Sequence, residues 1–172
     1  EVLLLDSPII SHLIQKIEGD NSGLHFVRVD SNHIDNLIKK EDAAISKLSE
    51  EEKESLKTSL ETYIPKAYTV QLEALDSNAA PFIITQPEFM RRMKEMSQSG
   101  GGGMFGMGNM PEMYNLVVNT NSDLANTILN TTDKTHQERL VKQALDLAKL
   151  SQNLLKGEDL TAFVKRSFEL VK

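Results

Sequence analysis

The side chains that enzymes use most often are present in this chain, but they do not form a known catalytic pattern. Its four histidines, His12, His25, His33 and His136, are scattered without the spacing of a metal site. No serine lies in a GxSxG motif, and the glycine run 100–103 lacks the Lys and Ser/Thr of a phosphate-binding loop. The sequence therefore predicts no catalytic, cofactor-binding or metal-binding residues in this chain.

The methionines indicate a different chemistry, which is adaptable apolar binding. All seven lie within residues 90–113, in two runs of three-residue spacing separated by glycines. In an expected helix over 87–97, one phenylalanine and two methionines fall at i, i+4 and i+7 and share a face. Methionine side chains adapt to differently shaped partners, and the glycines make the loop 98–112 costly to order. A core helix followed by a linker would give the same pattern. The candidate binding residues are Phe89, Met90, Met93 and Met96.

Length, composition and charge indicate a soluble globular protein of one domain, with length enough for a fragment of a second. The 172 residues are 40% apolar and 26% charged, and the absence of cysteine excludes disulfides and thiolate metal sites. Residues 133–172 carry eight Lys/Arg and six Asp/Glu, a balance of +2, so the net charge of −6 leaves −8 on residues 1–132. An acidic chain with few aromatics and no basic stripe is not expected to bind nucleic acid.

No membrane contact is expected either. No apolar run is long enough to span a bilayer, and no signal peptide opens the chain. The first residues, EVLLL, read as the middle of a strand, so we expect the chain to be a piece of a longer protein.

Strand-like and helix-like segments alternate irregularly, without a repeated βαβ unit. This order predicts an α+β fold with a small mixed sheet and packed helices. Within 41–62, the apolar residues Ile45, Leu48, Leu56 and Leu60 are expected to face the interior. The expected strands are 1–5, 25–29, 66–75, 82–85 and 113–119. The expected helices are 6–19, 41–62, 87–97, 120–129, 133–155 and 158–172.

Capping patterns mark two of these helices. Ser122 or Asp123 is expected to cap the helix that follows the last strand. In the penultimate helix, the stretch Thr135–Glu138 (THQE) resembles a capping box, and Gly157 is expected to end that helix.

Both C-terminal helices have apolar faces wider than one neighbour would cover. Two interpretations remain open: both helices pack only on their own sheet, or one side makes a symmetric contact with a second copy of the chain. In the first helix, a heptad-like row and a second row contain Leu140, Ala144, Leu147, Ser151, Leu154, Val141, Leu145, Ala148 and Leu155. The apolar residues of the last helix are Leu160, Phe163, Val164, Phe168, Leu170 and Val171.

The order of several segments resembles the C-terminal portion of the heat-shock protein 90 chaperones, most closely the bacterial high-temperature protein G branch. EVLLLDSPIISHLIQKIEG is similar to the family's EVLxLxDPIDE segment, and YTVQLEALDSNAAPFII is similar to its strand and DSPA turn. EFMRRMKEM lies where the family has a short helix patterned MERIMK. MYNLVVNTNSDL corresponds to LEINPxHPL, and DLTAFVKRSFELV corresponds to the closing DPxxFxxRxNxLL. The resemblance covers essentially the whole chain.

The resemblance implies a division at about residue 40. Residues 1–40 would be the tail of the middle domain, and residues 41–172 the C-terminal dimerisation and client-contact domain. The last two helices would form a four-helix bundle with those of a second protomer. The residues at or near this contact would be Leu140, Ala144, Leu147, Leu154, Phe163, Val164, Phe168 and Val171.

The resemblance also implies partners and a division of labour. The short amphipathic helix would contact unfolded or partly folded client proteins. Phe89 and Met93 match the family's two hydrophobic positions, whereas Met90 and Met96 are added from the helical stripe. ATP and Mg²⁺ would bind an N-terminal domain that this chain lacks, so we expect no cofactor and no enzyme activity here. The full-length protein would be a cytoplasmic, homodimeric ATPase of the stress response.

Two other functions fit parts of the same pattern. The chain is alternatively a monomeric, methionine-rich module that grips amphipathic peptides in a groove. It is also compatible with a fragment of a metabolic enzyme whose glycine loop acts as a lid. Self-association distinguishes the chaperone module from the monomeric peptide binder, and substrate turnover would indicate the enzyme.

Overall fold

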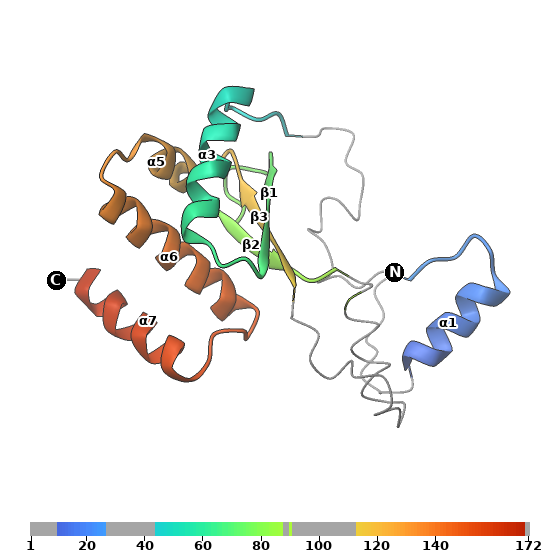
Figure 1. The fold of residues 1–172 in the computed structure, drawn as a ribbon. Coiled ribbons are helices and arrows are strands. Elements are labelled where there is room, and N and C mark those ends of the chain that lie inside the picture. Colours follow the sequence, from blue (N-terminus) through green and yellow to red (C-terminus); the bar gives the residue numbers. More distant parts are fainter. Residues whose placement is uncertain (1–9, 27–43, 88–89, 91–112, 171–172) are drawn as a thin grey trace.

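The computed structural model describes residues 10–26, 44–87, 90 and 113–170. Residues 44–87 and 113–170 form a small sheet and helices that pack on it and on one another (Figure 1). The expected α+β class is therefore confirmed. The elements in chain order are α1 (Ile10–Asp20), α3 (Glu50–Tyr63), β1 (Tyr68–Glu73), β2 (Phe82–Thr85), β3 (Tyr114–Asn119), α5 (Asp123–Asn130), α6 (Lys134–Ser151) and α7 (Gly157–Leu170).

The sheet has three strands in the order β1-β3-β2, and β3 is central. β1 runs parallel to β3, with Val70 opposite Leu116, whereas β2 runs antiparallel to β3, with Ile84 opposite the same leucine. The prediction of a small mixed sheet is thus confirmed. Valine, isoleucine, tyrosine and phenylalanine make up eight of the sixteen strand residues, as is typical of a partly buried pleated surface.

One face of the sheet is covered by α3, α5 and α6 (Figure 1). Leu56 and Leu60 of α3, four residues apart, are fully buried there, as are Ile128 of α5 and Val141 of α6. α7 packs on α6 rather than on the sheet, so it forms an outer layer (Figure 1). Within the described ranges, no helix is both long enough and apolar enough to cross a membrane.

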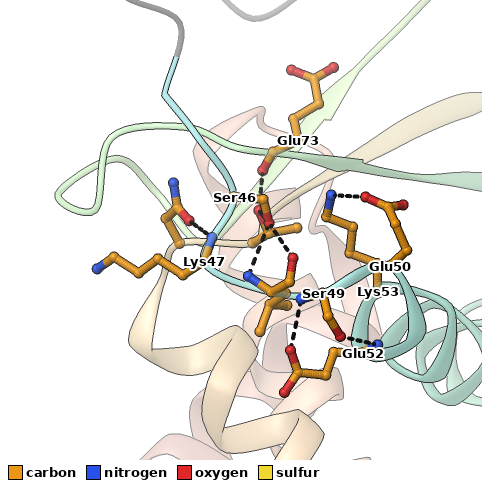
Figure 2. Close-up of polar contacts among 10 residues, drawn as sticks. Ser46, Lys47, Ser49, Glu50, Glu52, Lys53 and Glu73 are labelled. Carbon is orange, nitrogen blue, oxygen red and sulfur yellow. Dashed lines mark hydrogen bonds and ion pairs between the residues drawn. The ribbon is translucent and has the colours of Figure 1, made fainter.

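The helix expected over 41–62 begins later, at Glu50, because Ser49 caps it. The Ser49 hydroxyl accepts from the backbone N–H of Glu52 at 3.2 Å, and the Glu52 carboxylate accepts from the N–H of Ser49 at 2.8 Å (Figure 2). This reciprocal capping box fixes the first turn. Residues 44–48 are therefore not helical, and Ile45, expected to face the interior, has a side chain that is 87% exposed.

The boundaries of α6 also differ from the prediction. Asp133 caps α6, since its carboxylate accepts from the N–H of Thr135 at 2.9 Å, so the capping box predicted at Thr135–Glu138 is wrong. α6 ends at Ser151 rather than at Leu155, and Asn153 adopts a left-handed φ of 55° just beyond it. Gly157 stands at the start of α7 with a φ of 59°. Ser122 caps α5, as expected.

Candidate functional site

Apolar side chains lie exposed on the last two helices, α6 and α7. On α7, Val164 is 43% and Phe168 is 68% exposed, while on α6 Leu147 is 52% and Leu150 is 41% exposed. Burying a side chain of this size removes about 1.5–3 kcal/mol of unfavourable hydration, so leaving several in water needs an explanation. We refer to Leu147, Val164 and Phe168 as the apolar stripe.

The three members of the stripe lie on one side of the α6–α7 hairpin. Gln143 and Asp146 of α6 hydrogen-bond to α7, and Leu147 follows Asp146 by one residue. Their partners on α7 are Arg166 and Ser167, and Phe168 follows Ser167 by one residue. The two helices run antiparallel (Figure 1), so a step of one residue, about 100°, turns to the same side on both.

Polar side chains hold α7 on α6. Arg166 donates from Nε to Gln143 Oε1 at 2.8 Å and from Nη2 to Asp146 Oδ2 at 2.7 Å. Gln143 donates from Nε2 to Ser167 Oγ at 3.0 Å, and Ser167 donates to the carbonyl of Phe163. The Asp146 and Arg166 side chains are only 9% and 14% exposed. These directional contacts fix both the register and the rotation of α7. We refer to Gln143, Asp146, Arg166 and Ser167 as the hairpin network.

The seven described residues among those expected at the dimer contact fall into three groups. Ala144 and Phe163 are buried within the chain itself, at 6% and 7% exposure, and the Arg166 guanidinium lies 5.8 Å from the Phe163 ring centre. Leu140 and Leu154 are half-buried against the core. Leu147, Val164 and Phe168 are the exposed members, and Val171 is outside the described residues. Their role in dimerisation stays a prediction.

Most of the methionine segment lies outside the described residues. Phe89, Met93 and Met96 belong to that part of the chain. Met90 is described as helical and half-buried, and Met113, just before β3, is 44% exposed. The client-binding interpretation therefore also stays a prediction.

A second polar cluster lies at the end of β3. Asn119, Thr120, Asn121 and Ser122 are all buried, and we refer to them as the asparagine hub. Asn121 accepts from the N–H of Lys47 at 2.9 Å and donates to the carbonyls of Ile45 and Leu75 at 3.1 and 3.0 Å. An asparagine amide has two N–H donors and one oxygen acceptor. Asn121 uses all three in these hydrogen bonds, which connect two segments that are distant in sequence.

The other hub residues extend the same set of contacts. Asn119 accepts from the N–H of Leu75 and donates to the carbonyl of Asp76. Ser46 Oγ donates to Thr120 Oγ1 at 3.0 Å, and Thr120 donates to the carbonyl of Glu73 (Figure 2). The hub's hydrogen bonds end on backbone groups and side chains of this chain. Its residues therefore act as a clamp on residues 45–47 and on the turn after β1 rather than as a reactive site.

Within the described ranges, no three His, Asp or Glu side chains gather as a metal site. A depression of about 330 Å³ lies between α3 and the start of α6, with polar walls that include Thr58, Tyr63 and Lys134. The Tyr63 hydroxyl donates to Gln137 Oε1 at 3.2 Å in its wall.

The hairpin network was not predicted from the sequence. Gln143 and Asp146 stand opposite the buried row of α6, where polar side chains normally face water. The sequence offers one weak indication of a contact: Gln143 and Asp146 are three residues apart on a helix that a second amphipathic helix follows. Arg166 lies near the end of the chain, and no short-range spacing connects it with Asp146.

Comparison with known proteins identifies relatives of this chain. No known protein-family model matches it. Over 99% of its length it is 32% identical to chaperone protein HtpG of Bacteroides thetaiotaomicron and 31% identical to that of Bacteroides fragilis. Over 87% of its length it is 37% identical to chaperone protein HtpG of Porphyromonas gingivalis.

The matches cover only part of those relatives. The chain spans 35% of the Bacteroides proteins and 22% of the Porphyromonas protein. The alignment with the B. thetaiotaomicron protein runs over 238 residues, more than the 172 of this chain, so that relative carries additional residues within the matched stretch.

The relatives are molecular chaperones by name, and the sequence motifs resemble the C-terminal portion of such proteins. The chain belongs to the HtpG family, the bacterial branch of the heat-shock protein 90 chaperones.

Proposed function

We propose that this chain is the C-terminal dimerisation module of an ATP-dependent chaperone of the cytoplasm. Residues 1–40 form the tail of the middle domain in this proposal, and residues 41–172 form the C-terminal domain. The observation that carries the proposal is the apolar stripe, which the fold leaves on the outer side of the last two helices. The HtpG relatives support the chaperone class.

A second copy of the chain is the occupant that fits the stripe best. A two-fold contact is self-complementary, because each stripe meets the same stripe on its partner. Two helices from each protomer then enclose the stripe residues in a four-helix bundle. Leu140 and Leu154, half-buried beside the stripe, lie at the edge of this contact. Ala144 and Phe163 support it from within their own protomer.

The mechanical role of the module is to keep two ATPase arms at high local concentration. Linking the arms at one end makes their transient association intramolecular, which favours closure without any new contact between them. ATP and Mg²⁺ bind the N-terminal domain of the full-length protein in this proposal. The present chain would hold the two arms together and would take no part in ATP hydrolysis.

The methionine segment supplies the client contact in the same proposal. In the helix expected from the sequence, Phe89, Met90, Met93 and Met96 would present adaptable apolar side chains next to the glycine tract. Replacing Phe89, Met93 and Met96 with Ser is expected to weaken binding of an unfolded protein, such as a reduced and denatured substrate, while the dimer persists. A loss of thermal stability of about 2–5 kcal/mol per site would instead identify these residues as core.

The dimer contact is tested with two variants of one helix. Val164→Glu places a carboxylate in the stripe, whereas Ala162→Glu places the same charge on the opposite, exposed side of α7. Burying an unpaired charge is strongly unfavourable, so Val164→Glu is expected to raise the dimer Kd at least about a hundredfold, or about 3 kcal/mol. Ala162→Glu is expected to leave the Kd within about threefold of the parent value.

Sedimentation equilibrium measures both values, and circular dichroism checks that helix content is kept. Equal effects of the two substitutions would show that the stripe is not the contact. A parent chain that is monomeric but binds amphipathic peptides through its methionine segment would favour the alternative function, a monomeric peptide-binding module.

A further inference from the structure

Sulfur is distributed unevenly in this chain. There is no cysteine, and all seven methionines lie within residues 90–113. Methionine commonly fills irregular gaps in protein cores. In the part of the chain that the structure describes, however, the buried apolar core consists of leucine, isoleucine, valine, phenylalanine and alanine and contains no methionine. The packing of the described core therefore does not depend on any sulfur-containing side chain.

The apolar stripe is also free of sulfur. Its members are Leu147, Val164 and Phe168, and neither α6 nor α7 contains a methionine. A reagent that attacks thioethers therefore has no direct target in the described core or in the surface proposed for the dimer contact. Its targets are confined to the segment proposed for the client contact.

The two methionines that the structure describes lie at the two ends of this segment. Met113 is 44% exposed, whereas Met90 is half-buried. Tyr114, the next residue, donates its N–H to the carbonyl of Ala67 at 2.9 Å and so fixes the start of β3. This hydrogen bond does not involve the side chain of Met113. A chemical change at the Met113 sulfur is therefore expected to leave the pairing of β3 with β1 intact.

Methionine is the side chain of this chain that hydrogen peroxide oxidises most readily, because cysteine and tryptophan are both absent. The thioether sulfur takes one oxygen atom from the peroxide and gives up two electrons, the O–O bond breaks, and water is released. The sulfoxide that forms is polar, and reductases convert it back to the thioether. Oxidation therefore replaces an apolar, adaptable group with a polar one.

We propose that oxidation of the methionines to sulfoxides is a reversible switch of the client contact, and that Met113 is the more reactive of the two described sites. Peroxide makes the methionine segment polar, while the sulfur-free core and apolar stripe keep the fold and the dimer. The inference rests on the proposed function for what the segment binds. The oxidation itself and its effect on stability are measured without a client.

The test compares the parent chain with a variant in which all seven methionines are replaced by leucine. Leucine is apolar and similar in volume but has no sulfur to oxidise. Both chains are treated with hydrogen peroxide, which catalase then removes, and mass spectrometry of peptides measures the oxygen added at each methionine. Binding of reduced and carboxymethylated lactalbumin, a permanently unfolded probe, is measured before and after treatment.

In the parent chain, Met113 is expected to be oxidised at least about threefold faster than Met90, because its sulfur is more accessible to peroxide. Full oxidation is expected to raise the Kd for the probe at least about tenfold. The Tm should stay within about 2 °C, and the mass in sedimentation equilibrium should not change. Treatment with methionine sulfoxide reductases for both sulfoxide epimers should restore the original Kd.

The leucine variant has its own Kd for the probe, and peroxide is expected to change that value by less than about twofold. An equal loss of binding in this variant would place the effect outside the methionines and would overturn the proposal. If the variant does not fold, failure of the reductases to restore binding in the parent chain has the same meaning.

Two further results would overturn the switch. One is a fall in Tm of more than about 10 °C on oxidation, which would show that the methionines support the fold. The other is an unchanged Kd in a fully oxidised parent chain that binds the probe, which would leave the client contact in place. A parent chain that never binds the probe would contradict the proposed client contact itself, and the switch with it.

Discussion

The asparagine hub and the hairpin network are both sets of buried or partly buried side-chain hydrogen bonds, but they lie beside different kinds of surface. The hub joins three segments that are distant in sequence, and its four residues are buried. The network joins two consecutive helices, and the apolar residues beside it face outward. Polar contacts therefore fix geometry in both places. In the hub they hold separate segments of the chain together, and in the hairpin they fix an orientation of α7 that leaves apolar side chains exposed.

This difference predicts that the same substitution has very different effects in the two regions. Leu116 at the sheet centre is fully buried, whereas Leu147 of the stripe is half exposed. Leu116→Ala should lower the free energy of unfolding by about 2–5 kcal/mol because it leaves a cavity. Leu147→Ala should change it by at most about 0.5 kcal/mol in the monomer. Urea denaturation at a protein concentration below the dimer Kd measures the unfolding free energy of both variants. Similar losses for Leu116→Ala and Leu147→Ala would mean that the stripe belongs to the core of the monomer.

The hub itself is predicted to be sensitive to the loss of one amide. Asn121→Ala leaves the N–H of Lys47 and the carbonyls of Ile45 and Leu75 without their partner. Unfolding free energy should fall by roughly 2–3 kcal/mol, because buried polar groups lose their hydrogen bonds. Hydrogen exchange at residues 45–47 should accelerate as well. Asn78→Ala, at an exposed position in the turn after β1, is the control. If Asn78→Ala lowers the free energy of unfolding as much as Asn121→Ala does, the hub does not hold these segments in place.

The smallest loss of stability is expected at the start of α3. This helix begins just after residues 45–47, which the hub holds in place. Ser49→Ala removes one half of the capping box and should lower the free energy of unfolding by about 1 kcal/mol. Ser77→Ala, at an exposed turn position, should be neutral. Thermal unfolding of both variants decides the point. An equal Tm for Ser49→Ala and the parent chain would indicate that the hub alone holds residues 44–48 in place.

Strongly periodic segments were predictable from the sequence alone. The strands around Val70, Ile84 and Leu116 and the helices around Leu56 and Val141 are found where the patterns place them. Each pattern depends on neighbours in sequence, since it reports which side of a local element is buried. The α+β class follows from their order.

Helix ends and polar contacts between elements were harder to predict. Ser49 and Thr135 both fit a capping pattern, but only Ser49 is a cap, because Asp133 supplies the carboxylate for α6. The hub and the hairpin network join residues that are 20 to 76 positions apart. No local pattern reports such a pair, because the contact exists only after the elements have packed.

The measurement that tests this account most directly is sedimentation equilibrium of the chain itself, from low to high micromolar concentration. We predict the mass of a dimer that persists on dilution through this range, since the stripe is displayed for a second copy. A monomer mass at every concentration would contradict the proposed dimerisation module.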